Sequence, residues 1–123
     1  MTINGIHSLA KSEDYNSIEI LWETMTSADG TGHGADVSQY SELSYQATGT
    51  FGGATVVMQG SNDGGTTWAT LRDDLGNALS LTVAGLLSIL EPVGMIRPFL
   101  SVAGAGADID VTLFARRSPR GRN

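Results

Sequence analysis

The residues whose types and spacing carry the clearest chemistry lie at positions 61–68, where the sequence reads SNDGGTTW. The Asp63 carboxylate can accept hydrogen bonds from backbone N–H groups across a turn. Gly65 can adopt a positive φ without steric cost. Ser61 and Thr67 can tie the two ends of the loop, and Trp68 can pack beneath it. The segment therefore predicts a structural turn that clamps a β-hairpin.

This segment matches the pattern S-x-D-x-G-x-T-W in full, a pattern called the Asp-box. It resembles the turn found in the propeller blades of sialidases and in other unrelated β proteins. The resemblance implies no sialidase activity, because the box of that family lies away from the active site and recurs along a far longer chain. Here one copy is present, and Arg72 and Arg97 are the only arginines before position 116, so an arginine triad is missing.

Two carboxylate pairs are candidates for the acid and base of a hydrolase, namely Asp73 with Asp74 and Asp108 with Asp110. The first pair lies in a polar turn, and the second flanks the last expected strand on its solvent side. Weak Ca²⁺ binding at Asp63 or at Asp73 and Asp74 is an alternative, but the EF-hand pattern is missing. Solvated surface carboxylates are the favoured interpretation.

Histidine and cysteine chemistry adds no candidate. His7 and His33 are the only histidines, and each lies in a segment without regular periodicity, where a solvated loop histidine is expected. The chain has no cysteine, so it can form neither a disulfide nor a thiolate metal site. The sequence therefore predicts no catalytic residue, no cofactor and no bound metal, and we expect a protein that is not an enzyme.

The elements that position these residues are expected to be short β-strands. Apolar residues alternate with polar ones in most of them, and the 16 glycines suit many tight turns. Gly52 and Gly53 predict a hairpin with a primed turn. A helix over residues 75–90 is disfavoured by Asn77, Thr82 and Gly85. The pattern predicts an all-β fold, an antiparallel β-sandwich or jelly-roll-like barrel of about eight strands: 18–25, 44–51, 54–60, 68–72, 79–83, 86–90, 95–102 and 109–115.

The chain divides into three parts. Residues 1–17 are expected to form an irregular N-terminal arm, residues 18–115 a single β domain, and residues 116–123 a basic tail. Within the domain, residues 27–36 (SADGTGHGAD) predict a flexible loop or hairpin tip. No run approaches the roughly 18 apolar residues of a membrane-spanning helix, so no membrane contact is expected.

Charge separates the body from the tail. All 13 acidic residues but only three basic residues lie before position 116. An acidic body repels phosphate, so nucleic-acid binding is not expected to be the main role. The tail contains Arg116, Arg117, Arg120 and Arg122. Three interpretations stay open for it: a solubilising segment, a dock for an acidic neighbour, or a weak contact with nucleic acid.

Four apolar residues are expected on strand faces that point away from the core, namely Leu21, Met25, Met58 and Phe114. A second apolar layer indicates either a packed second sheet or a contact with a partner or another copy. Together with the four tail arginines, these residues form the candidate interface.

Residues 40–117 resemble small virion proteins of tailed bacteriophages. The similarity rests on YSELSYQATGTFGGATVVMQGSNDGGTTW and on LEPVGMIRPFLSVAGAGADIDVTLFARR. The family it resembles most is that of capsid cement, or decoration, proteins with a jelly-roll-like β fold. Residues 1–39 match no pattern of that family, and no binding residue can be carried over from it.

The resemblance implies a non-enzymatic homo-oligomer, dimer or trimer, that is made in the host cytoplasm and binds the major capsid protein on the outer surface of the virion. Its multivalent attachment would hold the shell against internal pressure. Two other roles stay open. One is a receptor- or carbohydrate-binding module of a tail or fibre, in which Trp22, Tyr40 and Tyr45 stack on sugars. The other is a tail tube or connector protein.

Overall fold

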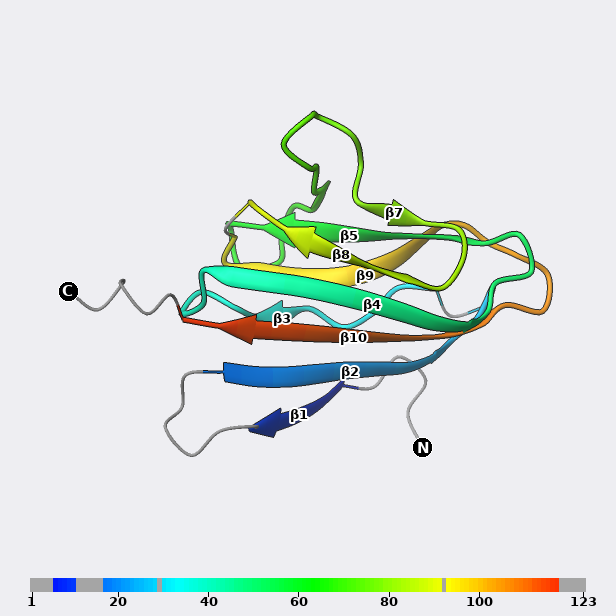
Figure 1. Cartoon of the computed structure of the whole chain (residues 1–123), viewed down its shortest axis with the longest axis horizontal. Coiled ribbons are helices and arrows are strands. Elements are labelled where there is room, and N and C mark those ends of the chain that lie inside the picture. Colours follow the sequence, from blue (N-terminus) through cyan, green and yellow to red (C-terminus); the bar gives the residue numbers. More distant parts are fainter. Residues whose placement is uncertain (1–5, 11–16, 29, 92, 118–123) are drawn as a thin grey trace.

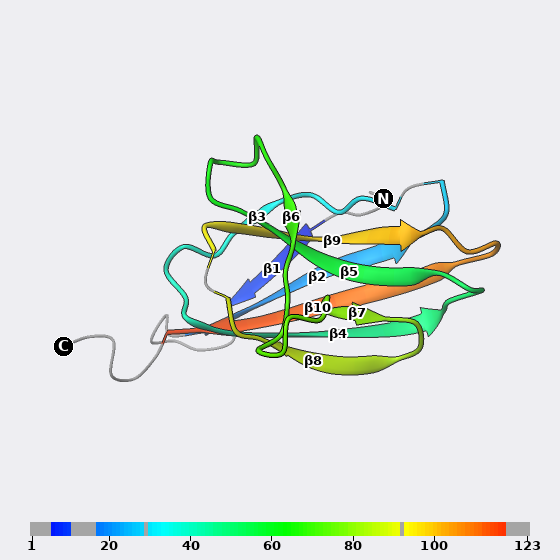
Figure 2. The ribbon, with the colours of Figure 1, turned by 90° about the horizontal axis from the view of Figure 1, so that it is seen from above.

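The computed structural model describes residues 6–10, 17–28, 30–91 and 93–117. Within these ranges the chain forms ten β-strands and no helix. The strands build two antiparallel sheets that pack against each other, as Figures 1 and 2 show. The expected all-β sandwich is therefore confirmed.

The first sheet has five strands and contains the longest ones. Its order is β1-β2-β10-β4-β8, so the strand latest in sequence lies in its centre. The strands are β1 (Ile6–Ala10), β2 (Ser17–Met25), β10 (Asp108–Arg116), β4 (Glu42–Thr50) and β8 (Gly85–Ile89).

The second sheet has two long strands between very short ones. Its order is β3-β9-β5-β6, and β7 also pairs with β5. The strands are β3 (Ala35–Asp36), β9 (Met95–Val102), β5 (Thr55–Ser61), β6 (Ala69–Thr70) and β7 (Ser80–Leu81). Each of the eight strands expected from the sequence has a counterpart, and β1 and β3 are additional.

The core lies between the two sheets and follows the expected alternation where the strands are regular. On β10 every second residue from Ile109 to Ala115 is fully buried, and on β4 Leu43, Tyr45 and Ala47 are buried. The Tyr45 hydroxyl donates a hydrogen bond of 2.8 Å to the Leu79 carbonyl. Burial raises the pKa of this phenol, so it stays neutral and remains a donor.

The turn at Gly52 and Gly53 differs from the expectation in its consequence. Both residues have positive φ, and Ala54 N–H donates to the Phe51 carbonyl at 2.8 Å, as in a primed turn. However, β4 pairs with β10 and β8, whereas β5 pairs with β9, β6 and β7. The expected β4–β5 hairpin is wrong, because this turn carries the chain from one sheet to the other.

A bulge in β2 explains why Met25 faces the core. Along β2 the three steps from Trp22 to Met25 match only two steps of β10, from Val111 to Ile109. Thr24 takes up the extra residue with φ 59°, and its N–H donates to an Asp110 carboxylate oxygen at 2.9 Å. A bulge breaks the alternation of faces, so Trp22 and Met25 both point inward.

Two segments expected to be irregular are paired to strands. Within the N-terminal arm, Ile6–Ala10 forms β1 and pairs with β2; the rest of that arm, apart from Ser17, lies outside the described residues. Residues 30–37 run along β9, where Gly32 N–H donates to the Pro98 carbonyl and Val37 N–H to the Gly94 carbonyl, both at 2.9 Å. Within the stretch 27–36, for which a flexible loop or hairpin tip is expected, the two residues of β3 are therefore an added strand, and residues 30–37 lie along one edge of β9.

Candidate functional site: the outer face of the first sheet

The Asp-box segment forms the turn of the β5–β6 hairpin, as its sequence predicts. One Asp63 carboxylate oxygen accepts hydrogen bonds from Thr66 N–H at 3.1 Å and Thr67 N–H at 2.9 Å. The Ser61 hydroxyl donates to the same oxygen at 2.7 Å and accepts from Gly65 N–H at 2.9 Å. These bonds bind the carboxylate in its charged form, and they lower the pKa of Asp63 to about 2, with the Thr67 N–H as the largest cause.

Trp68 closes this turn against the outer face of the second sheet. Its indole N–H donates to the Gly65 carbonyl at 2.9 Å, and the Arg97 guanidinium lies 4.2 Å from the centre of the indole ring. Arg97 also donates to the Gln59 side chain at 2.8 Å. The Asp63 carboxylate, the Ser61 hydroxyl and the Trp68 indole N–H all bind groups of the same turn, so we assign the cluster a structural role.

The other carboxylates of the sequence analysis do not converge on a reactive centre. Asp73 accepts hydrogen bonds at 2.9 Å from Leu75 N–H and Asn77 N–H, which makes it the organiser of its own turn. Asp108 and Asp110 lie on the exposed side of β10, where Asp110 caps the Thr24 bulge. Among the described residues, no group of three or more His, Cys, Asp or Glu side chains could hold a metal ion.

The structure also shows the surroundings of His33 and of the three aromatic residues expected to stack on sugars. His33 is exposed, and its carbonyl accepts the indole N–H of Trp22 at 2.9 Å; the side chain of His7 lies outside the described part of the chain. Trp22 and Tyr45 are buried, with 0% and 1% of their surface exposed. They cannot stack on a sugar, so the carbohydrate-binding interpretation loses two of its three aromatic residues, and Tyr40 packs partly buried against the core.

The basic tail begins with two arginines that bind their own chain. Arg116 is the last residue of β10, and its guanidinium forms an exposed ion pair of 2.5 Å with Glu42 on β4. The Arg117 guanidinium donates to the Gln39 side chain. Arg120 and Arg122 lie outside the described residues.

The four apolar candidate interface residues separate into two groups. Met25 and Met58 are fully buried, so their expected exposure is wrong. For Met25 the reason is the Thr24 bulge. For Met58 the reason is that β5 is an interior strand on which Val56, Val57 and Met58 are all buried, so its pattern does not reveal which face is outside. Phe114 is 42% exposed and Leu21 is partly buried, and both point away from the core.

Leu21 and Phe114 share the outer face of the first sheet with a third apolar residue, Leu86. The register places one row of residues across four strands, with Thr112 opposite both Leu21 and Gln46, and Gln46 opposite Leu86. In the next row Phe114 lies between Glu19 and Ser44. Polar side chains thus separate the apolar ones, and one of them, Glu19 beside Phe114, is charged. The strands of this face lie side by side in Figure 1.

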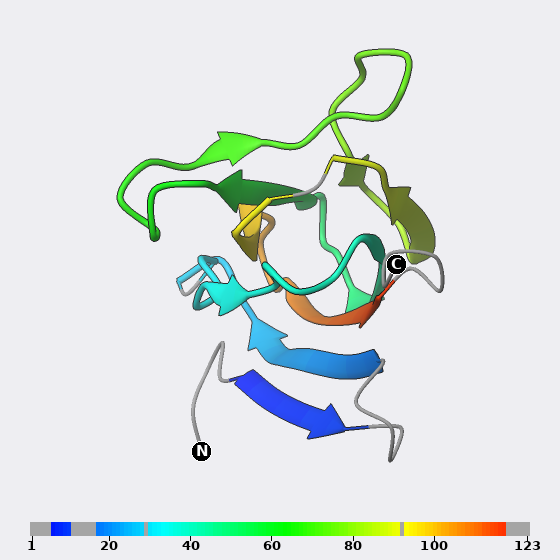
Figure 3. The same cartoon turned by 90° about the vertical axis from the view of Figure 1, so that its left-hand side faces the viewer.

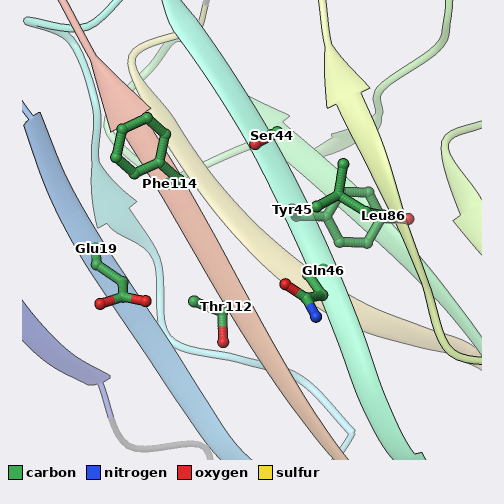
Figure 4. Close-up of a pocket in the computed structure, with 7 residues that line it drawn as sticks. All are labelled: Glu19, Ser44, Tyr45, Gln46, Leu86, Thr112 and Phe114. Carbon is green, nitrogen blue, oxygen red and sulfur yellow. The ribbon is translucent and has the colours of Figure 1, made fainter.

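A shallow hollow of about 90 Å³ opens on this face. Figure 4 shows that Phe114 and Thr112 come from the central strand β10, with Glu19 on one side and Ser44, Gln46 and Leu86 on the other. The hydroxyl of Thr112 and the amide of Gln46 offer hydrogen bonds beside the exposed Phe114 ring. This arrangement can hold a protruding side chain of a protein surface, and we name these six residues the hollow face.

Carboxylates also lie on this face. Glu19 lines the hollow beside Phe114, Asp108 and Asp110 occupy exposed positions of β10, and Glu42 on β4 is ion-paired with Arg116. The face therefore combines exposed apolar groups with negative charge.

Sequence reasoning missed the most exposed apolar residues. Leu75 is 81% exposed, Val83 66%, Leu86 60% and Leu90 57%. A signal was available, because residues 75–90 contain no charged side chain although their strands are short. Their alternation resembled that of buried strands, which concealed their position at the margin of the molecule.

The described residues contain no helix long and apolar enough to cross a membrane. A comparison of the chain with models of protein families and with curated proteins finds no match.

Proposed function

We propose that this chain is a structural protein of a bacteriophage virion, and specifically a cement protein that binds the major capsid protein on the outside of the shell. Two arguments support the proposal. The sequence of residues 40–117 resembles that family, and the outer face of the first sheet exposes apolar side chains that a protein partner would cover. In this proposal the protein carries out no reaction and needs no cofactor.

The observation that carries the proposal is the exposure of Phe114 at the centre of the hollow face. Phe114 lies in the middle strand of a five-stranded sheet, and 42% of its surface is exposed to water. A residue of the core leaves far less of its surface exposed. Covering the Phe114 ring with a partner recovers hydrophobic free energy. Aromatic side chains near the centre of an interface commonly contribute most of its binding energy.

The charges on this face describe the partner. Because Glu19, Asp108 and Asp110 present carboxylates on this face, the complementary surface should combine apolar or aromatic groups with basic side chains. The acidic body of the chain would also speed the encounter with such a surface at low ionic strength. We therefore expect attachment to weaken as salt is added.

The proposed role is mechanical and depends on repetition. A single copy buries a modest area on the shell, but an oligomer that contacts several capsid subunits gains avidity without new kinds of contact. The protein would be made in the host cytoplasm and act on the outer surface of the virion.

The test is reattachment to shells that lack the protein. Particles of a phage that lacks the gene for this protein are mixed with the purified protein. The bound protein is then measured after sedimentation of the particles. We expect saturable binding at many sites per shell, and we expect Phe114→Lys to lower the affinity at least tenfold, which is about 1.4 kcal/mol.

Ser101→Lys is the matched control, since it introduces the same positive charge at an exposed position of β9, on the other sheet. It should bind the shells nearly as well as the unmodified protein. Binding at one end of the particle alone would instead support the tail role. Equal binding by the two lysine variants would refute the assignment to the hollow face.

A further inference from the structure

The strand β8 forms one edge of the first sheet, and it differs from the strands at the other sheet edges. The second sheet ends in β3 and β6, which have two residues each. In contrast, β8 has five residues and lies along the lower margin of Figure 2. An edge strand of this length presents a row of unpaired backbone N–H and C=O groups with which another strand can pair.

The side chains at β8 do nothing to discourage such pairing. Proteins usually protect an edge strand from pairing with other chains by means of lysine, proline, a bulge or an inward-pointing charge. Residues 75–90 contain neither a charge nor a proline. Leu86 on the strand, Leu90 just after it and Val83 just before it are all more than half exposed. The opposite edge strand of the first sheet, β1, also has five residues, but charged residues follow it in the sequence: Lys11, Glu13 and Asp14.

A rigid loop adds a further apolar group on this side. Residues 72–77 are held by Asp73 and by a hydrogen bond of 2.9 Å from Arg72 to the Gly76 carbonyl. Arg72 N–H also donates to the Glu91 carboxylate at 2.7 Å, which ties the loop to the chain that follows β8. The loop projects on the same side of the molecule as β8 in Figures 1 and 3, and it presents Leu75 at 81% exposure.

The distribution of charge indicates which partner fits the exposed edge of β8. Copies of a chain with net charge −6 repel each other, and face-to-face stacking of two first sheets would oppose their carboxylates. At β8 two copies can meet through uncharged residues alone. Antiparallel pairing about a twofold axis brings Leu86 and Ser88 opposite uncharged residues of the other copy, so the strand is complementary to itself.

We propose that two copies of this chain associate by antiparallel pairing of their β8 strands, which joins the two first sheets into one continuous ten-stranded sheet. This deepens the self-association part of the proposed function by naming its surface. It leaves the hollow face of each copy on the same side of the joined sheet, available to a shell.

The first test measures mass in solution with the purified full-length protein alone, so it does not depend on shell binding. Sedimentation velocity should show a dimer, and the double variant Leu86→Lys/Ser88→Lys should raise its dissociation constant at least about tenfold. Thr48→Lys, on β4, should leave the dimer intact. Added salt should strengthen the dimer because it screens the repulsion between acidic copies. A monomeric unmodified protein, or a dimer that survives the double variant, would overturn the proposal.

The second test maps the contact without adding charge. Because the chain has no cysteine, the single variants Leu86→Cys and Ser88→Cys and their combination each place thiols only on β8. Mild oxidation should give a disulfide-linked dimer in at least one of them, and which one reports the register. Thr48→Cys should stay uncrosslinked. Crosslinking of Thr48→Cys with none of the β8 variants would place the contact on the sheet face and contradict strand pairing.

Discussion

The outer faces of the two sheets are completed in different ways. On the second sheet the Arg97 guanidinium lies over the Trp68 ring and donates a hydrogen bond to Gln59. On the first sheet Phe114 and Leu86 project from bare strands and are 42% and 60% exposed. The chain thus covers part of one outer face with its own residues and leaves apolar side chains exposed on the other. Substitutions on the second sheet should therefore affect stability, and those on the first sheet should affect binding.

The largest expected effect is that of Met58→Ala, which sets the scale for a fully buried position. Met58 is completely buried between the sheets, so truncation leaves a cavity and should lower the free energy of unfolding by about 2–5 kcal/mol. Urea denaturation followed by tryptophan fluorescence measures this change. A loss below about 1 kcal/mol would mean that β5 is not an interior strand.

Trp68→Ala should have the next largest effect. It removes the ring that Arg97 covers and the indole N–H bond to Gly65, and we expect a loss of about 1–3 kcal/mol in the free energy of unfolding. Trp68→Phe keeps the ring and loses only the N–H, so it should restore part of the stability. If Trp68→Ala is as stable as the unmodified protein, the second face is not closed by these contacts.

Asp63 predicts a smaller, pH-dependent effect. Its pKa is about 2 in the folded protein and about 3.9 in an unfolded chain. A carboxylate with a lowered pKa stabilises the fold above its unfolded pKa, and this stability is lost as the pH falls from about 4 to about 2. Asp63→Asn should melt several degrees lower at pH 7, and its melting temperature should fall less than that of the unmodified protein across this pH window.

Asp74→Asn serves as the control for this measurement. It removes the same charge at an exposed position of the next loop without touching the Asp-box bonds. Its melting temperature at neutral pH should stay close to that of the unmodified protein. If both variants melt alike at every pH, the hydrogen bonds of Asp63 do not stabilise the turn.

The smallest expected effect on stability is that of Phe114→Ser. Because the ring is already partly in water, the free energy of unfolding should fall by about 1 kcal/mol or less. Binding to shells should nevertheless weaken at least tenfold, as for Phe114→Lys. A large loss of stability would show that Phe114 belongs to the core of the domain, and would remove it from the interface.

Local patterns predicted the strands well. The alternation in β4 and β10 is regular, and the Asp-box bonds form within eight consecutive residues, so both can be recognised without knowledge of the rest of the chain. For the same reason the positive φ of Gly52 and Gly53 was predictable.

What could not be predicted depends on distant residues. The sheet that β5 joins is set by its pairing with β9, about 40 positions later in the sequence for most pairs, and no property of the Gly52–Gly53 turn encodes it. The inward turn of Met25 depends on a bulge that Asp110 supports from another strand. On the candidate site, Phe114 followed from alternation alone. Leu86 did not, because its exposure results from the marginal position of β8.

The position of β10 between β2 and β4 has a consequence during synthesis. Residues 108–116 leave the ribosome after both of their neighbours, so the first sheet cannot close until they are available. Until then β2 and β4 each expose an unpaired side to other nascent chains. A cell that expresses this chain at a high level must therefore keep these half-sheets apart. Slower translation or a chaperone should raise the yield of folded protein more than added stability would.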